Sequence, residues 1–224
     1  MAIDKSSAPA WVKGVIIFVA VTFVISIGIP FIGSLSSPPT STGTQTGQGS
    51  TTATDTLAGI AGKYSARTIG VDEALKKDPK NYDLLLAQAQ TYQDWAGEIA
   101  QSTAGTSGAD RPLWMLSVDY YKRALAVKPG DPNATTDSAI AQFYSGDTSG
   151  AVTTAEGVAK ANPTFAQVQF NLGVFYSASG DNAKGIAAYE AYVKLAPKGD
   201  LVGEANNRIA QLKKPVTPSI ATTP

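Results

Sequence analysis

The longest apolar stretch of the chain lies near its N-terminus. Residues 14–32 read GVIIFVAVTFVISIGIPFI, and no charged residue occurs between Lys13 and Asp55. A helix needs about 20 predominantly apolar residues to cross the hydrocarbon core of a bilayer. Trp11 stands at the edge of the run, where an amphipathic ring suits the membrane interface. We therefore predict a transmembrane helix over residues 14–33 that holds the protein in the lipid bilayer.

A cleaved signal peptide is the alternative interpretation of this segment. Signal peptides usually have an apolar region of about 7–15 residues before a small-residue cleavage site, so the length of this run favours a retained anchor. Lys5 and Lys13 precede the run, and no Lys or Arg follows it until Lys63. Because positive charge stays on the cytoplasmic side, we expect a single-pass protein of the cell membrane. Residues 1–13 would be cytoplasmic and the remainder extracytoplasmic.

Two segments have the composition of flexible polypeptide. Residues 34–56 are rich in Ser, Thr, Gly, Gln and Pro and carry few apolar side chains. Such a segment cannot bury enough surface to offset the entropy lost on ordering. Residues 214–224 are similar in composition. We predict a flexible linker over residues 34–56, a folded domain over residues 57–213 and a disordered tail over residues 214–224.

Prolines recur at a regular spacing through the predicted folded domain. Pro129, Pro163 and Pro197 are 34 residues apart, and Pro79 precedes Pro129 by 50 residues, which is one such period plus 16. Three of these prolines end the similar phrases EALKKDP, RALAVKP and AYVKLAP. A constant period of this size indicates stacked copies of one supersecondary unit.

The best-defined unit covers residues 166–199. Its small, aromatic and turn residues stand at fixed offsets: Leu172-Gly173, Tyr176, Gly180-Asp181, Tyr189 and Pro197. These residues and the period resemble the tetratricopeptide repeat (TPR) family, and the whole chain is similar to its single-span, membrane-anchored bacterial members. The resemblance implies an all-α fold. About three helix–turn–helix repeats and flanking helices would form a superhelix behind one N-terminal transmembrane helix.

Two more units fit the same register. Residues 132–165 keep the Gly146-Asp147 turn but have Gln142 where the next unit has its tyrosine. Residues 82–131 form the first repeat, which carries the additional residues as an insertion over 97–112. The Gly, Ser and Thr content of the insertion predicts a surface loop.

Further helices are expected on both sides of the three repeats. Residues 56–77 precede the first repeat and end in the same Ala-Leu-x-x-x-Pro pattern as a repeat. Residues 201–213 are amphipathic and more polar, which is typical of the capping helix that keeps the end of a repeat array soluble. Stacking would bury the apolar faces that single hairpins leave exposed.

The resemblance implies a role in binding another protein. In the TPR family an extended peptide or a helix of the partner commonly lies in a concave groove lined by the first helix of each repeat. The lining positions of the three repeats correspond here to Leu86, Gln90, Gln93 and Asp94; Asn133, Thr136, Ile140, Phe143 and Tyr144; and Gln167, Phe170, Asn171, Val174 and Ser177. TPR proteins that clamp the C-terminal carboxylate of chaperones use Lys and Arg at these lining positions. This chain has neither residue at these positions. A neutral or apolar partner segment is therefore expected.

The alternative for the apolar members of this set is the hydrophobic core. Apolar residues at helical spacing usually pack against neighbouring helices. For Ile140, Phe143, Phe170 and Val174 taken singly, packing in the core is the favoured interpretation. For the set as a whole, some exposed apolar surface is expected.

Composition excludes several kinds of chemistry. The chain has no cysteine and no histidine, which removes thiol nucleophiles, disulfides, zinc fingers and Ser-His-Asp triads. Its net charge is zero, so no basic excess points to nucleic acid. The acidic pair Asp72-Glu73 precedes Lys76 and Lys77 at helical spacing, which is typical of a solvated face. We therefore expect no enzyme, no cofactor and no metal site.

These observations predict a membrane-anchored TPR scaffold. It would bind a partner protein on the extracytoplasmic side and assist the assembly or stability of a membrane or envelope complex. The alternative is an accessory structural subunit of a membrane complex, held mainly through its transmembrane helix. The repeats would then cover part of the complex as a docking surface.

Overall fold

The computed structural model describes residues 56–102 and 108–214. The regular elements in that part are all α-helices: α2 (Leu57–Lys77), α3 (Tyr82–Gln101), α4 (Arg111–Val127), α5 (Pro132–Ser145), α6 (Thr148–Ala161), α7 (Ala166–Ala178), α8 (Asn182–Leu195) and α9 (Val202–Leu212). The predicted transmembrane helix and nearly all of the predicted linker and tail lie outside the described residues. None of the helices described is long and apolar enough to cross a membrane.

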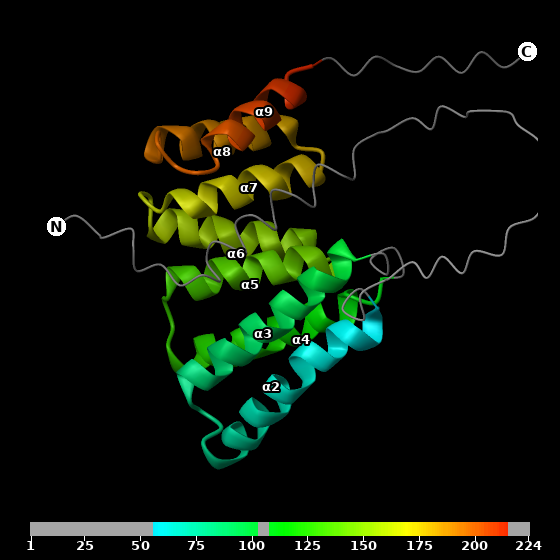
Figure 1. Ribbon diagram of the computed structural model, residues 1–224. Helices are drawn as coiled ribbons and strands as arrows, with labels where there is room; N and C mark the ends of the chain where they lie inside the picture. The colour runs from blue at the N-terminus through cyan, green and yellow to red at the C-terminus, as the bar shows by residue number, and fades with distance from the viewer. Residues whose placement is uncertain (1–55, 103–107, 215–224) are drawn as a thin grey trace, which may run out of the picture.

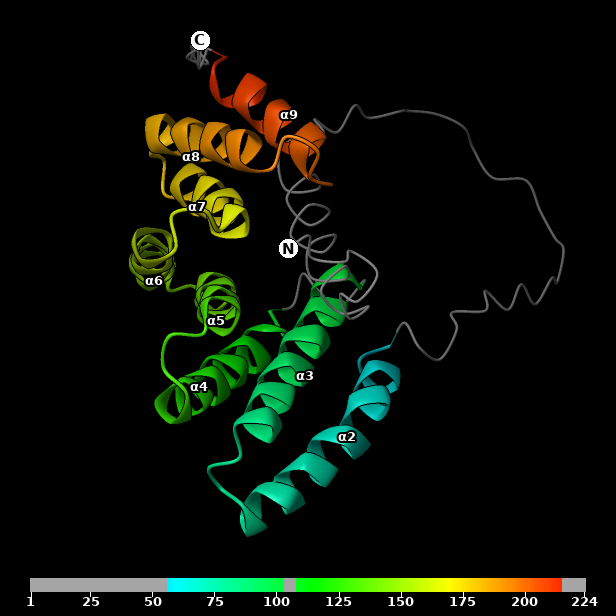
Figure 2. The same cartoon turned by 90° about the vertical axis from the view of Figure 1, so that its left-hand side faces the viewer.

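Consecutive helices pack as antiparallel pairs (Figure 1). The pairs are α3 with α4, α5 with α6 and α7 with α8, and neighbouring pairs meet through α4–α5 and α6–α7. In Figure 2 the pairs form an arc, with α3, α5 and α7 on its inner side and α4, α6 and α8 on its outer side. This arrangement confirms the predicted all-α superhelix of stacked hairpins. The side formed by α3, α5 and α7 is called the inner face below.

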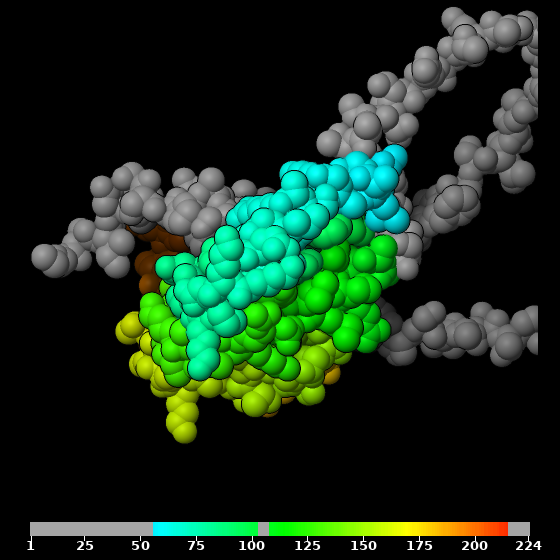
Figure 3. Space-filling model, turned by 90° about the horizontal axis from the view of Figure 1, so that it is seen from below, coloured from blue at the N-terminus to red at the C-terminus, as the bar shows by residue number. Residues whose placement is uncertain are grey.

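Additional helices cover the two ends of the arc. At one end α2 packs on α3, and Figure 3 looks onto this end, where α2 lies across the helices that follow it. At the other end α9 packs on α8. The predicted flanking helices over residues 56–77 and 201–213 therefore exist, with Thr56 accepting a capping hydrogen bond from the Gly59 N–H at the start of α2.

The repeated Gly-Asp turns explain where the second helices begin. Gly146 and Gly180 have φ angles of 98° and 84°, a left-handed conformation that glycine adopts without a steric penalty. The following Asp147 and Asp181 each accept a hydrogen bond from a backbone N–H in the first turn of the next helix. Such caps satisfy N–H groups that have no partner within the helix. Each turn thus ends one helix and starts the next.

Gly173 marks the closest approach of α7 and α8. A Cβ atom at this position would lie 2.6 Å from the ring of Tyr189, and that ring is fully buried. On the facing helix, a Cβ at Gly185 would lie 2.7 Å from the Ser177 hydroxyl oxygen. The two glycines therefore allow these helices to pack closely enough to enclose the tyrosine.

Part of the insertion predicted as a loop over residues 97–112 is helical. Helix α3 continues to Gln101, and α4 begins at Arg111. The cause is packing against α2, since Ile99 is buried with Ile60 and Tyr64 of that helix. The Tyr64 hydroxyl also donates a hydrogen bond of 2.7 Å to Glu98 Oε2. Contacts with a helix outside the repeat thus extend α3.

Candidate functional site

The residues predicted to line a partner-binding groove all lie on the inner helices, but they divide into two groups. Those that are exposed or partly exposed are Leu86, Gln90, Asp94, Asn133, Phe143, Tyr144, Gln167 and Ser177. Those that are buried are Gln93, Thr136, Ile140, Phe170, Asn171 and Val174. For Gln93, Thr136 and Asn171 the prediction of an exposed lining is corrected, because these side chains lie in the interior. For Ile140, Phe170 and Val174 burial agrees with the core packing that was favoured for them singly.

The buried group reflects the packing of α5 and α7 between neighbouring helices. Phe170 makes edge-to-face contacts with Tyr189 and Tyr192, with ring centroids 5.4 Å apart in both cases. The Thr136 hydroxyl donates a hydrogen bond of 2.7 Å to the Pro132 carbonyl. Helix α7 also has apolar residues around much of its circumference, which is typical of a buried helix.

Four aromatic residues join α4, α5 and α7 beside the exposed group. Phe143 stacks on Phe175 with centroids 4.9 Å apart and meets the edge of Tyr144 at 5.1 Å. Tyr144 stacks on Trp114 at 4.8 Å. We call these four residues the aromatic cluster. Trp114 and Phe175 are buried, so they hold the partly exposed Phe143 and Tyr144 in fixed orientations, each pair adding about 0.5–1.5 kcal/mol beyond area burial.

Two aspartates of the inner helices, Asp94 and Asp137, lie in surroundings that favour the protonated carboxyl group. Asp137 in α5 is 4% exposed and forms no hydrogen bond or ion pair with the described residues. Burial, followed by the negative charges of Asp131 and Asp94, raises the pKa of Asp137 to about 7. Burial likewise raises the pKa of Asp94 in α3 to about 6, against the opposing effects of Arg67 and Lys63 in α2. Both carboxyl groups therefore titrate near neutral pH.

The charges of both acids act on the hydroxyl of Tyr121. Tyr121 in α4 is fully buried, and its Oη has no hydrogen-bond partner among the described residues. Burial raises its pKa, and the charges of Asp137 and Asp94 raise it further, so the hydroxyl lies within electrostatic range of both carboxyl groups. A buried polar group without a partner costs about 1–3 kcal/mol.

The repeat register contains a signal for Asp137 that the sequence interpretation did not use. One period later the chain has Asn171, and both side chains are buried. Charged groups are rarely buried without a partner. An ionisable residue where the neighbouring repeat buries a neutral amide is therefore unusual. Within the described residues, no group of three or more acidic side chains could hold a metal ion.

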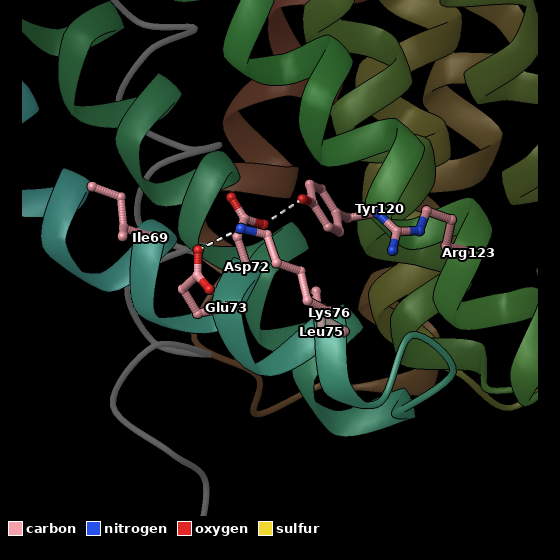
Figure 4. A pocket seen from close by; sticks show the side chains of 7 residues that line it. All are labelled: Ile69, Asp72, Glu73, Leu75, Lys76, Tyr120 and Arg123. Atoms are coloured by element: carbon pink, nitrogen blue, oxygen red, sulfur yellow. Dashed lines mark hydrogen bonds and ion pairs between the residues drawn. The ribbon is translucent and has the colours of Figure 1, made fainter.

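A pocket of about 440 Å³ lies between α2 and α4 (Figure 4). Most of its polar side chains pair with one another: the Tyr120 hydroxyl donates to Asp72 Oδ1 at 2.6 Å, and Glu73 pairs with Lys76. The Arg123 guanidinium lies over the Tyr120 ring, 4.7 Å from its centroid. Gln88 Nε2 also donates to Asp72 Oδ1, at 3.0 Å. Asp72 is therefore a structural acceptor rather than the solvated acid that the sequence predicted.

Comparison with known proteins supports the same repeat unit. Residues 136–200 match the family model described as tetratricopeptide repeat, whereas no curated protein matches the chain. A crystal structure of MamA is 21% identical, with a TM-score of 0.55, and the alignment covers 67% of this chain and 77% of that one. A second MamA crystal structure is 21% identical, with a TM-score of 0.54, and the alignment covers 67% and 72%. At this identity the likeness shows the fold alone.

Proposed function

We propose, from the membership of residues 136–200 in the tetratricopeptide repeat family, that this chain is a scaffold holding a segment of a partner protein on its inner face. The observation that carries the proposal is the aromatic cluster. It presents the partly exposed Phe143 and Tyr144 on a rigid support. Aromatic residues are enriched at the centres of protein interfaces, where Lys and Glu are depleted. The neutral Gln90, Asn133 and Gln167 on the inner helices suit a neutral or apolar partner segment.

The proposal includes a membrane anchor. The uncharged, apolar run over residues 14–32 supports a helix in the bilayer, and residues 34–56 supply a linker. The positions of Lys5, Lys13 and Lys63 support an extracytoplasmic repeat domain. A scaffold tethered in this way would assist the assembly or stability of a membrane or envelope complex.

Site-specific photocrosslinking tests the inner face. A photoreactive amino acid is introduced into the full chain, one position at a time, at Gln90, Asn133 or Gln167. Crosslinking in native membranes is expected to capture one common partner from these positions, because all three lie on inner helices and are at least partly exposed.

The matched controls for this experiment are exposed positions on the outer helices. Asp119, Lys160 and Lys194 lie on α4, α6 and α8 and are expected to capture little of the same partner. Equal capture from inner and outer positions would contradict binding at the inner face.

The alternative function, an accessory subunit held through the membrane helix, makes a different prediction. Residues 14–33 are replaced by an unrelated transmembrane sequence of equal length, and the partner is isolated from detergent-solubilised membranes. The scaffold proposal expects the partner to co-purify as before, since its contacts are with the repeats. Loss of the partner, with the chimaera still in the membrane fraction, would instead favour the accessory subunit.

A further inference from the structure

We propose that the pocket between α2 and α4 (Figure 4) binds a segment of a partner protein in which an acidic side chain lies close to an aliphatic one. The inner face is formed by α3, α5 and α7, so this pocket is a second docking surface. The inference therefore stands apart from the proposed function and adds a contact of different chemistry.

The acidic side chains that line the pocket already have partners within the chain. Asp72 accepts one hydrogen bond from the Tyr120 hydroxyl at 2.6 Å and another from Gln88 Nε2 at 3.0 Å. Glu73 forms an ion pair with Lys76. Both acids are therefore compensated before any partner binds.

Arg123 on α4 is the lining cation whose charge is not matched. Its side chain is partly exposed, and its guanidinium lies over the Tyr120 ring, 4.7 Å from the centroid. It forms no ion pair with any residue that the structure describes. The Tyr120 ring beneath it is held in turn by stacking on Tyr92, with centroids 5.6 Å apart. A guanidinium has donors only, and it binds a carboxylate through two parallel hydrogen bonds, so an acidic side chain complements it.

The apolar part of the lining suits an aliphatic side chain. Ile69 borders the pocket and is 62% exposed, whereas Leu75 is buried with Leu85 and Ala124 and forms an apolar floor. A single exposed aliphatic residue is common on protein surfaces. Here it adjoins a tyrosine and an arginine, which are residue types enriched where protein interfaces bind most strongly.

The charge balance of the pocket favours a single carboxylate over a phosphate group or a nucleic acid. Lys76 and Arg123 carry the positive charges of the lining. Asp72 and Glu73 carry as many negative charges, so the net charge is zero. Ligands with several negative charges are bound by an excess of cations, which this pocket lacks. One carboxylate needs only the unmatched guanidinium of Arg123.

The size of the pocket limits the spacing of the two contacts in the partner. Its volume is about 440 Å³. A sphere of this volume is ~9 Å across, and an extended peptide advances about 3.3 Å per residue. The acidic and the aliphatic residue are therefore expected within about three positions of each other.

Selection from a phage-displayed library of random peptides tests this pattern. The full-length protein in detergent micelles is the target, and the peptides are fused to the coat protein through their C-termini, so that they present no terminal carboxylate. A photoreactive leucine analogue at Ile69 identifies the selected peptides that bind in this pocket. These peptides are expected to contain Asp or Glu within about three positions of Leu, Ile or Val.

Variants at Arg123 test the ion pair with a selected synthetic peptide that has an amidated C-terminus. Arg123→Gln is expected to weaken its binding by about tenfold, since the charged hydrogen bonds are lost. Lys122→Gln removes the same charge from the exposed neighbouring position, which does not line the pocket, and is expected to leave the affinity unchanged. Circular dichroism establishes that each variant is folded.

A charge exchange separates direct contact from a structural role of Arg123. Arg123→Glu is expected to reject the selected peptide and to bind a peptide in which lysine replaces the acidic residue. Loss of both peptides with the fold intact, or equal affinity of Arg123→Gln and the parent protein, would overturn the inference.

The capture positions distinguish this inference from the proposed function. Peptides that crosslink from Gln167 on the inner face but never from Ile69 would overturn the second docking surface and leave the inner face intact. Capture from Ile69 of peptides without an enriched acidic residue would also overturn it. The pattern expected at Ile69 supports the pocket whatever the inner positions capture.

Discussion

Replacing Asp137 by asparagine is expected to make the protein more stable at about pH 8 and to change its stability little at about pH 4. The pKa of Asp137 is about 7 in the folded protein, against 3.8 for an ordinary aspartate. The folded state therefore holds its proton more tightly than the unfolded chain does. As pH rises from about 4 to about 7, the unfolded chain releases this proton first, so the free energy of unfolding falls and then levels off above pH 7. Because asparagine does not ionise, the variant is not destabilised in this way as the pH rises.

The expected gain follows from the size of the shift. Each pKa unit corresponds to about 1.4 kcal/mol, so Asp137→Asn is expected to raise the free energy of unfolding at about pH 8 by on the order of 2–4 kcal/mol. Urea unfolding of the full chain at several pH values measures it, with Asp119→Asn as the matched charge change. Some pH dependence will remain in the variant, because the pKa of Asp94 is also raised, to about 6. A loss of stability at about pH 8 would mean that Asp137 already has a compensating partner in the free protein.

Gly173→Ala is expected to destabilise the protein although alanine is the better helix former. The new Cβ would lie 2.6 Å from two atoms of the Tyr189 ring. That ring is fully buried and packs edge-to-face with Phe170, so it has little room to move. Overpacking of this kind typically costs about 1–3 kcal/mol, which outweighs the gain of about 1 kcal/mol from helix propensity. Urea or thermal unfolding measures the difference.

Gly157 provides the matched control for this substitution. It lies in the exposed part of α6, and no heavy atom lies within 4 Å of the position of its missing Cβ. Gly157→Ala is therefore expected to stabilise the protein by about 0.5–1 kcal/mol. If alanine stabilised the protein equally at both positions, the close approach of α7 and α8 would not be a constraint on the fold.

The sequence predicted the helix array well because its signals are local and repeat with the period. The turns at Gly146-Asp147 and Gly180-Asp181 mark the ends of helices directly, and the prolines mark the ends of repeats. Where contacts between distant parts of the chain decide the outcome, the prediction differed from the structure. The extra helical residues at the end of α3 depend on Ile99 packing against Ile60 and Tyr64, and no period reveals that contact.

The candidate site was less predictable than the fold. Register alone placed the lining residues on the correct helices but did not separate the partly exposed Phe143 from the buried Phe170, because exposure depends on the neighbouring helices. The surroundings of Asp94, Tyr121 and Asp137 were not predicted, because they depend on contacts between different helices. Only the packed structure shows that Tyr121 and Asp137 are buried, and that the Tyr121 hydroxyl has no hydrogen-bond partner among the described residues.

The contacts between helices have a consequence for how the molecule is made. Each described helix packs chiefly against the helix before it and the helix after it, so none of these helices waits for a distant part of the chain. Short contact separations keep the entropy of loop closure small and favour fast folding. The array can therefore assemble in order, beginning at α2, while the ribosome is still delivering the C-terminal helices.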